Sequence, residues 1–71
     1  MDIIYQKAGE RIAACRRQKN IMQKELAFKI GISNIYLSNI ENGRVVPSLQ
    51  VFVNICLTLE KTPDYFLFGK I

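Results

Sequence analysis

Glycine and proline divide this chain into short pieces with the character of helices. The prolines stand at positions 47 and 63, and the glycines at positions 9, 31, 43 and 69. Between these positions apolar residues recur at spacings of three and four, which is the period of an amphipathic helix. No segment alternates apolar and polar residues as a half-buried strand does. The pattern therefore predicts a compact all-α fold of five short helices.

The bounds of these helices follow from the breaks and from residues that start or end helices. Ser33 and Thr62 are good N-caps, and Asn20 and Gly31 can take the left-handed conformation that ends a helix. The helices are expected at about Ile4–Gln18, Gln23–Ile30, Asn34–Asn42, Ser48–Leu59 and Pro63–Leu67. Their inner faces predict a core of Ala8, Ile12, Cys15, Leu26, Ala27, Ile30, Ile32, Leu37, Ile40, Leu49, Phe52, Ile55, Cys56 and Leu59.

The segment from Gln23 to Gly43 is the most informative part of the chain. It contains two helices of about eight residues, joined by a tight turn of about three, Gly31-Ile32-Ser33. That arrangement is the helix-turn-helix unit. Ala27 is small, which lets the second helix of the unit cross the first closely.

Length and charge narrow the class of protein. With 71 residues the chain forms one domain, residues 1–71. Its net charge of +4 suits a polyanionic partner, although many soluble proteins of other functions are mildly basic. No apolar run approaches the roughly 20 residues that span a bilayer, and the start, Met1–Tyr5, lacks the pattern of a secretory signal. We expect a cytoplasmic protein without membrane contact.

The titratable side chains argue against a metal site and against catalysis. Cys15 and Cys56 stand among apolar residues at helical spacing, which favours two buried free thiols. A disulfide is the alternative, and it is not expected in a reducing cytoplasm. The chain has no histidine, so neither a metal site nor a nucleophile–base pair can be assembled from obvious parts. We expect no metal, no cofactor and no enzyme activity.

The chain resembles the helix-turn-helix domains of the Cro and phage-repressor type, also called Xre-like. The likeness extends from Gly9 to Leu67 and combines several short motifs: Gln23-x-x-Leu26-Ala27, Gly31-Ile32-Ser33, Glu41-x-Gly43, Pro47-Ser48 and Thr62-Pro63-Asp64-Tyr65-Phe66-Leu67. Each motif alone is weak, and the combination is specific. The resemblance implies a five-helix, lambda-repressor-like DNA-binding domain. Met22 and Glu60 depart from the family, which usually has a capping Ser or Thr and a Gly at these positions.

The helix from Asn34 to Asn42 is the expected recognition helix. On a helical wheel Leu37, Ile40 and Glu41 share one face, and a polar strip occupies the other. A helix docked in the major groove presents its N-terminal residues to base edges, where Asn pairs with adenine and Ile packs on a thymine methyl. The resemblance implies that the base-reading residues are Asn34, Ile35, Ser38 and Asn39. The wheel alone would also fit a solvated polar surface.

Phosphate contacts are expected around the rim of this helix. Gln23 stands at the start of its helix, where free backbone N–H groups and the helix dipole attract an anion. The resemblance makes Gln23 a phosphate-binding residue and adds Asn42 and Arg44. Further candidates are Tyr36, Arg17 and Lys24, and the last two are also explained by solubility alone.

Glu41 carries a charge on an otherwise apolar inner face. A buried carboxylate without a partner is costly. The resemblance names Arg16, near the end of the first helix, as its partner. We therefore predict an Arg16–Glu41 ion pair that fixes the first helix against the recognition helix.

A homodimer is expected, because one recognition helix reads only a few base pairs and a domain of this size is marginally stable alone. The partner DNA would then be a palindromic operator. The candidate dimer residues are apolar beyond what one core face requires: Val51, Val53, Leu57, Phe68 and Ile71. Some of them could instead complete the core.

Two functions of different classes fit these features. The first is a sequence-specific transcription regulator that binds double-stranded DNA, most simply as a repressor. The second is a protein-interaction module, such as the antitoxin of a toxin–antitoxin pair. A co-purifying protein partner would favour the second.

Overall fold

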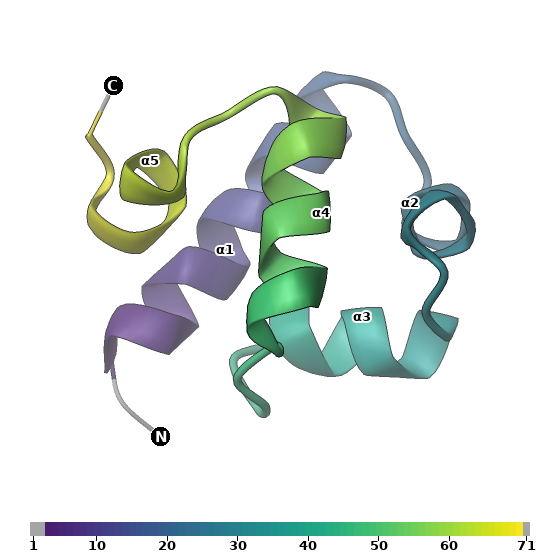
Figure 1. The fold of residues 1–71 in the computed structure, drawn as a ribbon, viewed down its shortest axis with the longest axis horizontal. Helices are drawn as coiled ribbons and strands as arrows, with labels where there is room; N and C mark the ends of the chain where they lie inside the picture. Colours follow the sequence, from purple (N-terminus) through teal and green to yellow (C-terminus); the bar gives the residue numbers. More distant parts are fainter. Residues whose placement is uncertain (1–2, 71) are drawn as a thin grey trace.

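The computed structural model describes residues 3–70 and contains five helices and no strand within that range (Figure 1). The helices are α1 (Ile3–Gln18), α2 (Gln23–Ile30), α3 (Asn34–Glu41), α4 (Leu49–Leu59) and α5 (Pro63–Phe68). The predicted all-α, five-helix fold is thus confirmed, and the helix ends differ from the expected ones by one residue at most. Ile71, one of the dimer candidates, lies outside the described residues.

Side-chain caps explain where three of the helices begin. Ser33, Ser48 and Thr62 precede α3, α4 and α5, and each hydroxyl accepts a hydrogen bond from the backbone N–H three residues later, at 3.0 to 3.2 Å. Such a bond satisfies one of the N–H groups that have no partner inside the helix. Pro63 follows as the first residue of α5, where its missing N–H costs nothing.

The other helix ends show how the chain compensates for unusual residues. Met22 precedes α2 without a side-chain cap, and its own N–H donates instead to the Glu25 carboxylate at 3.0 Å. Asn20 and Gly31 have φ of 58° and 77°, the left-handed conformation expected for both. Glu60, which stands where the family usually has Gly, takes the same conformation with φ 59°. The turn after α4 therefore forms despite the side chain.

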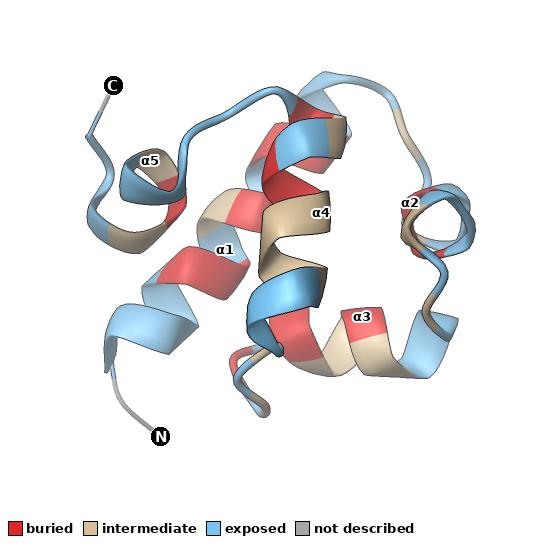
Figure 2. Ribbon diagram, viewed as in Figure 1, coloured by how far each residue is buried: buried red, intermediate tan, exposed pale blue. Residues whose placement is uncertain are grey.

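The core lies where α1 to α5 converge, and most of the predicted core residues are in it (Figure 2). Leu26, Leu37, Ile55 and Leu59 have no exposed surface, and Phe66 of α5, which was not in the predicted set, is equally buried. Partly buried side chains pack against this cluster: Ile21, Ile30, Ile32, Tyr36, Val45, Val51, Phe52 and Tyr65. One dimer candidate, Val51, thus contributes to its own protomer's core.

The prediction that Leu49 belongs to the core was wrong, because 79% of this residue is exposed. Leu49 precedes the buried Ile55 by six residues, which is about 1.7 turns of an α-helix. Its side chain therefore lies about a third of a turn from the core face of α4. Its spacing from Phe52 suggested a common face, but Phe52 itself lies at the edge of the core, half-buried.

The two cysteines, Cys15 and Cys56, are buried free thiols, as their apolar surroundings predicted. Burial raises the pKa of the Cys56 thiol. Among residues 3–70 there is no helix long and apolar enough to cross a membrane. In the same range no three His, Cys, Asp or Glu side chains come together as a metal site would need.

Gly9 allows α1 to approach the end of α3 closely. A Cβ atom at this position would overlap the carbonyl oxygen of Ile40 and lie 2.8 Å from the carbonyl oxygen of Glu41. Real Cβ atoms do not come this near to backbone, so α1 and α3 would have to separate.

We predict that Gly9→Ala destabilises the protein, although alanine is the better helix former by about 1 kcal/mol. Overpacking against rigid backbone costs about 1–3 kcal/mol, which outweighs the propensity gain. Urea unfolding followed by circular dichroism measures the change. As a control, Ala14→Gly on the exposed side of α1 measures the stability change that comes from helix propensity alone. A Gly9→Ala protein more stable than wild type would contradict the close approach.

Candidate nucleic-acid interface

The inner face of α3 is the one predicted from the wheel. Leu37, Ile40 and Glu41 are buried, and their spacing of three, four and one puts them on the same side of the helix. Leu37 and Ile40 join the hydrophobic core, so α3 cannot rotate about its axis without exposing them.

The opposite face of α3 is open, most of all at its N-terminal end (Figure 2). Asn34 is exposed, and 74% of Ile35 is accessible although its side chain is apolar. Ser38 and Asn39, one turn further on, are half-buried. The structure therefore leaves Asn34 and Ile35 fully accessible and Ser38 and Asn39 partly accessible.

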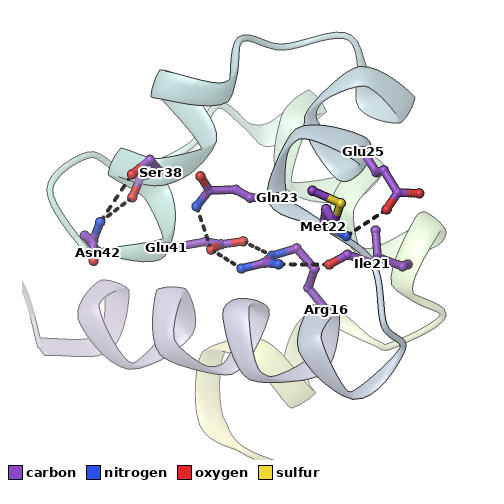
Figure 3. Close-up of polar contacts among 8 residues, drawn as sticks. All are labelled: Arg16, Ile21, Met22, Gln23, Glu25, Ser38, Glu41 and Asn42. Atoms are coloured by element: carbon purple, nitrogen blue, oxygen red, sulfur yellow. Dashed lines mark hydrogen bonds and ion pairs between the residues drawn. The ribbon is translucent and has the colours of Figure 1, made fainter.

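A buried ion pair connects α1 to α3 (Figure 3). Arg16 Nε donates to Glu41 Oε2 at 2.8 Å, and Arg16 Nη2 donates to Glu41 Oε1 at 3.1 Å. Both residues have only 7% of their surface exposed. Because the two contacts are parallel and bidentate, the pair fixes orientation as well as distance.

The same two residues hold the start of α2. Arg16 Nη1 donates to the carbonyl oxygen of Ile21 at 2.8 Å, in the turn between α1 and α2. The side-chain amide of Gln23 donates from Nε2 to Glu41 Oε1 at 2.9 Å (Figure 3). The two charged groups therefore join α1, the following turn, α2 and α3 in one network.

Gln23 lies at the position predicted for a phosphate-binding residue, but its amide faces inward to Glu41. It is half-buried, and one of its two amide hydrogens is used by the carboxylate. The second amide hydrogen stays available. The first backbone N–H groups of α2 also have no acceptor inside the helix.

The other residues predicted to bind phosphate differ in whether their polar atoms are already used in hydrogen bonds within the protein. Asn42 is exposed, but its Nδ2 donates back to the Ser38 carbonyl oxygen at 2.9 Å. The Tyr36 hydroxyl accepts from the Ser48 N–H at 3.3 Å, and its own proton is left to donate. The side chain of Arg44 is exposed just beyond α3.

The two weaker rim candidates, Arg17 and Lys24, are both exposed. Arg17 is in the last turn of α1 and Lys24 is in the first turn of α2. The turn between them is the one whose Ile21 carbonyl oxygen accepts a hydrogen bond from Arg16. This position is compatible with phosphate contacts beside the start of α2, and it is equally compatible with side chains that are simply solvated.

Comparison with known proteins assigns the family. A helix-turn-helix family model matches residues 12–66. The chain belongs to the helix-turn-helix family. It is 40% identical over 53 residues to the ImmF control region 10 kDa protein of Bacillus phage phi105, and 33% identical over 63 residues to the repressor protein C2 of Salmonella phage P22. These matches cover 75% and 89% of this chain, but only 59% and 29% of the relatives.

Solved structures superpose closely on this fold. The P22 c2 repressor in complex with a synthetic operator has a TM-score of 0.86 and 34% identity, covering 92% of this chain and 98% of that one. The restriction-modification controller protein C.AhdI from Aeromonas hydrophila has a TM-score of 0.84 and 26% identity, with the same coverage. The lambda-repressor-like fold is therefore confirmed.

Two structural features were missed by sequence reasoning in this helix-turn-helix chain. The Gln23–Glu41 bond joins residues that had been assigned separate roles. Arg11 donates from Nη1 to the carbonyl oxygens of Phe66 and Leu67, at 3.0 and 3.2 Å, and thereby ties α1 to α5. Its spacing of three from Ala8, on the inner stripe of α1, is the signal that could have indicated a structural arginine.

We predict that Arg16→Ala lowers the free energy of unfolding by about 3–5 kcal/mol, because the Glu41 carboxylate would stay buried without its cation. Thermal and urea unfolding measure the loss. The matched control is Arg17→Ala, which removes the same charge from the exposed neighbour and should change stability by less than about 0.5 kcal/mol. Equal melting temperatures for Arg16→Ala and wild type would refute the role of the pair.

Proposed function

We propose that this protein is a sequence-specific transcription regulator, and in the simplest case a repressor, that binds double-stranded DNA as a homodimer with α3 in the major groove. The observation that carries the proposal is the exposed N-terminal end of α3, with Asn34 and Ile35, followed by the half-buried Ser38 and Asn39, on a helix that its buried residues anchor in the core. The P22 c2 repressor, which has the same fold, was solved in complex with a synthetic operator. The proposal includes action in the cytoplasm and requires no cofactor or catalytic residue.

The exposed end of α3 suits readout of base edges. The amide of Asn34 can donate and accept at once, which matches the N6 and N7 atoms of adenine. Ile35 places an apolar surface beside it, 74% exposed, and thymine is the base that offers a methyl group in the major groove. Ser38 and Asn39 lie one turn further toward the C-terminal end of α3 and are placed to contact a following base pair.

Groups at the ends of α2 and α3 suit the DNA backbone. At the start of α2, the second amide hydrogen of Gln23 and the free backbone N–H groups can donate to one phosphate. Beyond α3, Arg44 offers a charge and Tyr36 a hydroxyl proton. Because Glu41 holds Gln23 and α3 together, phosphate contacts and base contacts have a fixed relative position.

Selection from a pool of random DNA duplexes tests this proposal. We expect one enriched, palindromic sequence, and a slope of log Kobs against log salt near −6 if the dimer meets about seven phosphates. Arg44→Ala should make the slope less negative by about two for the dimer, since each copy loses one contact. Fluorescence anisotropy over a salt series measures both.

The control variant for the salt experiment is Lys61→Ala. Lys61 lies in the connection between α4 and α5, at the end of α4 far from α3 (Figure 1), and its removal should leave the slope unchanged. A slope near zero, or a pool with no enriched sequence, would rule out the proposed function.

A further inference from the structure

The side chain of Asn42 is turned back along α3 and contacts Ser38 twice (Figure 3). Its Nδ2 donates to the Ser38 carbonyl oxygen at 2.9 Å and to the Ser38 Oγ at 3.4 Å. A carbonyl oxygen accepts hydrogen bonds and cannot donate them, so the atom that faces it must be the amide nitrogen. The contact therefore fixes the amide with its nitrogen toward Ser38 and its oxygen turned away.

The backbone at the end of α3 is already paired without this side chain. Asn42 is the C-cap of α3, and its backbone N–H donates to the same Ser38 carbonyl oxygen at 3.0 Å. Gly43 then turns the chain in the left-handed conformation, with φ 73°, which glycine adopts without strain. The distinct contribution of the Asn42 side chain is therefore its contact with the Ser38 hydroxyl.

The contact from Asn42 biases the Ser38 hydroxyl toward donating. A serine hydroxyl has one proton and two lone pairs, and it rotates to suit its partners. Because an N–H from Asn42 occupies one lone pair, the hydroxyl proton cannot point toward Asn42. Accepting this hydrogen bond also strengthens the hydroxyl as a donor, since hydrogen bonds in a chain polarise one another. Ser38 is only half-buried, so its proton can reach a group outside the protein.

A donating hydroxyl distinguishes among the bases of the major groove. Asn34, Ser38 and Asn42 follow one another at intervals of four residues and therefore lie along one side of α3. Guanine, adenine and thymine each present an acceptor in the major groove, and guanine presents two. Cytosine presents only the donor of its N4 amino group. A donating Ser38 thus favours guanine most and cytosine least on the strand that it contacts.

A direct phosphate contact is the alternative role for the Asn42 side chain. Phosphate oxygens receive hydrogen bonds from the protein, but the amide atom of Asn42 that is turned away from Ser38 is itself an acceptor (Figure 3). Arg44, two residues later, is exposed and carries only donors. A phosphate near the end of α3 is therefore better bound by Arg44, and Asn42 is left to act on Ser38.

We propose that Asn42 is a positioning residue for base readout: it orients the Ser38 hydroxyl as a hydrogen-bond donor, and Ser38 then selects a base that presents an acceptor, guanine above the others. Asn42 acts on the DNA sequence through Ser38 and does not itself bind phosphate. The inference rests on the proposed DNA-binding function and adds to it the polarity of one contact.

A double-mutant cycle with DNA tests this role. Selection from random duplexes with Ser38→Ala identifies the base pair that Ser38 reads, because the preference at that pair is lost. Wild type should favour an acceptor base over cytosine there by about 2–10-fold, the effect of one neutral hydrogen bond. Asn42→Ala should reduce the preference at this pair and at no other. In the Ser38→Ala background, Asn42→Ala should change neither preference nor affinity, because the two residues act as one unit.

Arg44→Ala is the matched control, since loss of a phosphate contact weakens all sequences alike. It should lower the affinity by the same factor in wild type and in the Ser38→Ala background. If Asn42→Ala behaves in this way, or if wild type favours cytosine at the Ser38 pair, the inference is overturned and the proposed function stands. A wild type that selects no sequence would refute the proposed function, and this inference with it.

Nuclear magnetic resonance of the protein without DNA tests the contact itself. The side-chain amide protons of Asn42 should shift when Ser38→Ala removes their hydroxyl partner. Those of Asn54 on α4 should stay where they are, which shows that the fold is unchanged. Asn42 amide signals that do not respond to Ser38→Ala would overturn the inference, whatever the protein binds.

Discussion

The bidentate contact between Arg16 and Glu41 is the constraint on which the rest of the structure depends. Among residues 3–70, these are the charged residues that are buried. Each is costly to bury alone, so the two must stay together for the fold to be stable. Arg16 also holds the Ile21 carbonyl, and Glu41 also accepts from Gln23. One pair of charges thereby sets the positions of α1, α2 and α3.

The orientation of Glu41 decides which side of α3 faces outward. Glu41 follows Leu37 by four residues, about one helical turn, so drawing Glu41 inward also buries Leu37. Ile35, two residues before Leu37 and so nearly on the opposite side of α3, then faces away from the protein. Gly9 then lets α1 approach the end of α3 closely enough for the pair to form. A buried charge at the C-terminal end of α3 thus controls how the N-terminal end of the same helix is presented.

The sequence predicted what depends on local periodicity, and the family resemblance added one contact between distant residues, the Arg16–Glu41 pair, which the structure confirms. Other contacts between distant residues could not be predicted. Helix ends and most of the core follow from caps and from the period of 3.6 residues, which is why they were correct. The core prediction for Leu49 was wrong because it used the spacing from Phe52, and Phe52 lies at the edge of the buried face of α4. The Gln23–Glu41 bond joins residues 18 positions apart, and no periodicity reports such a contact. The roles of the DNA-contacting and dimer residues need a partner to be observed, so they stay predictions.

The central claim is that the exposed end of α3 reads base edges, and the affinity of Asn34→Ala for the selected duplex tests it most directly. The account predicts a loss of about 1–3 kcal/mol for the selected sequence, with unchanged affinity for an unrelated duplex and an unchanged melting temperature. Asn54→Ala, an equivalent change on α4, should bind the selected sequence as wild type does. If Asn34→Ala also binds the selected sequence as wild type does, or loses affinity equally for both duplexes, the claim is contradicted.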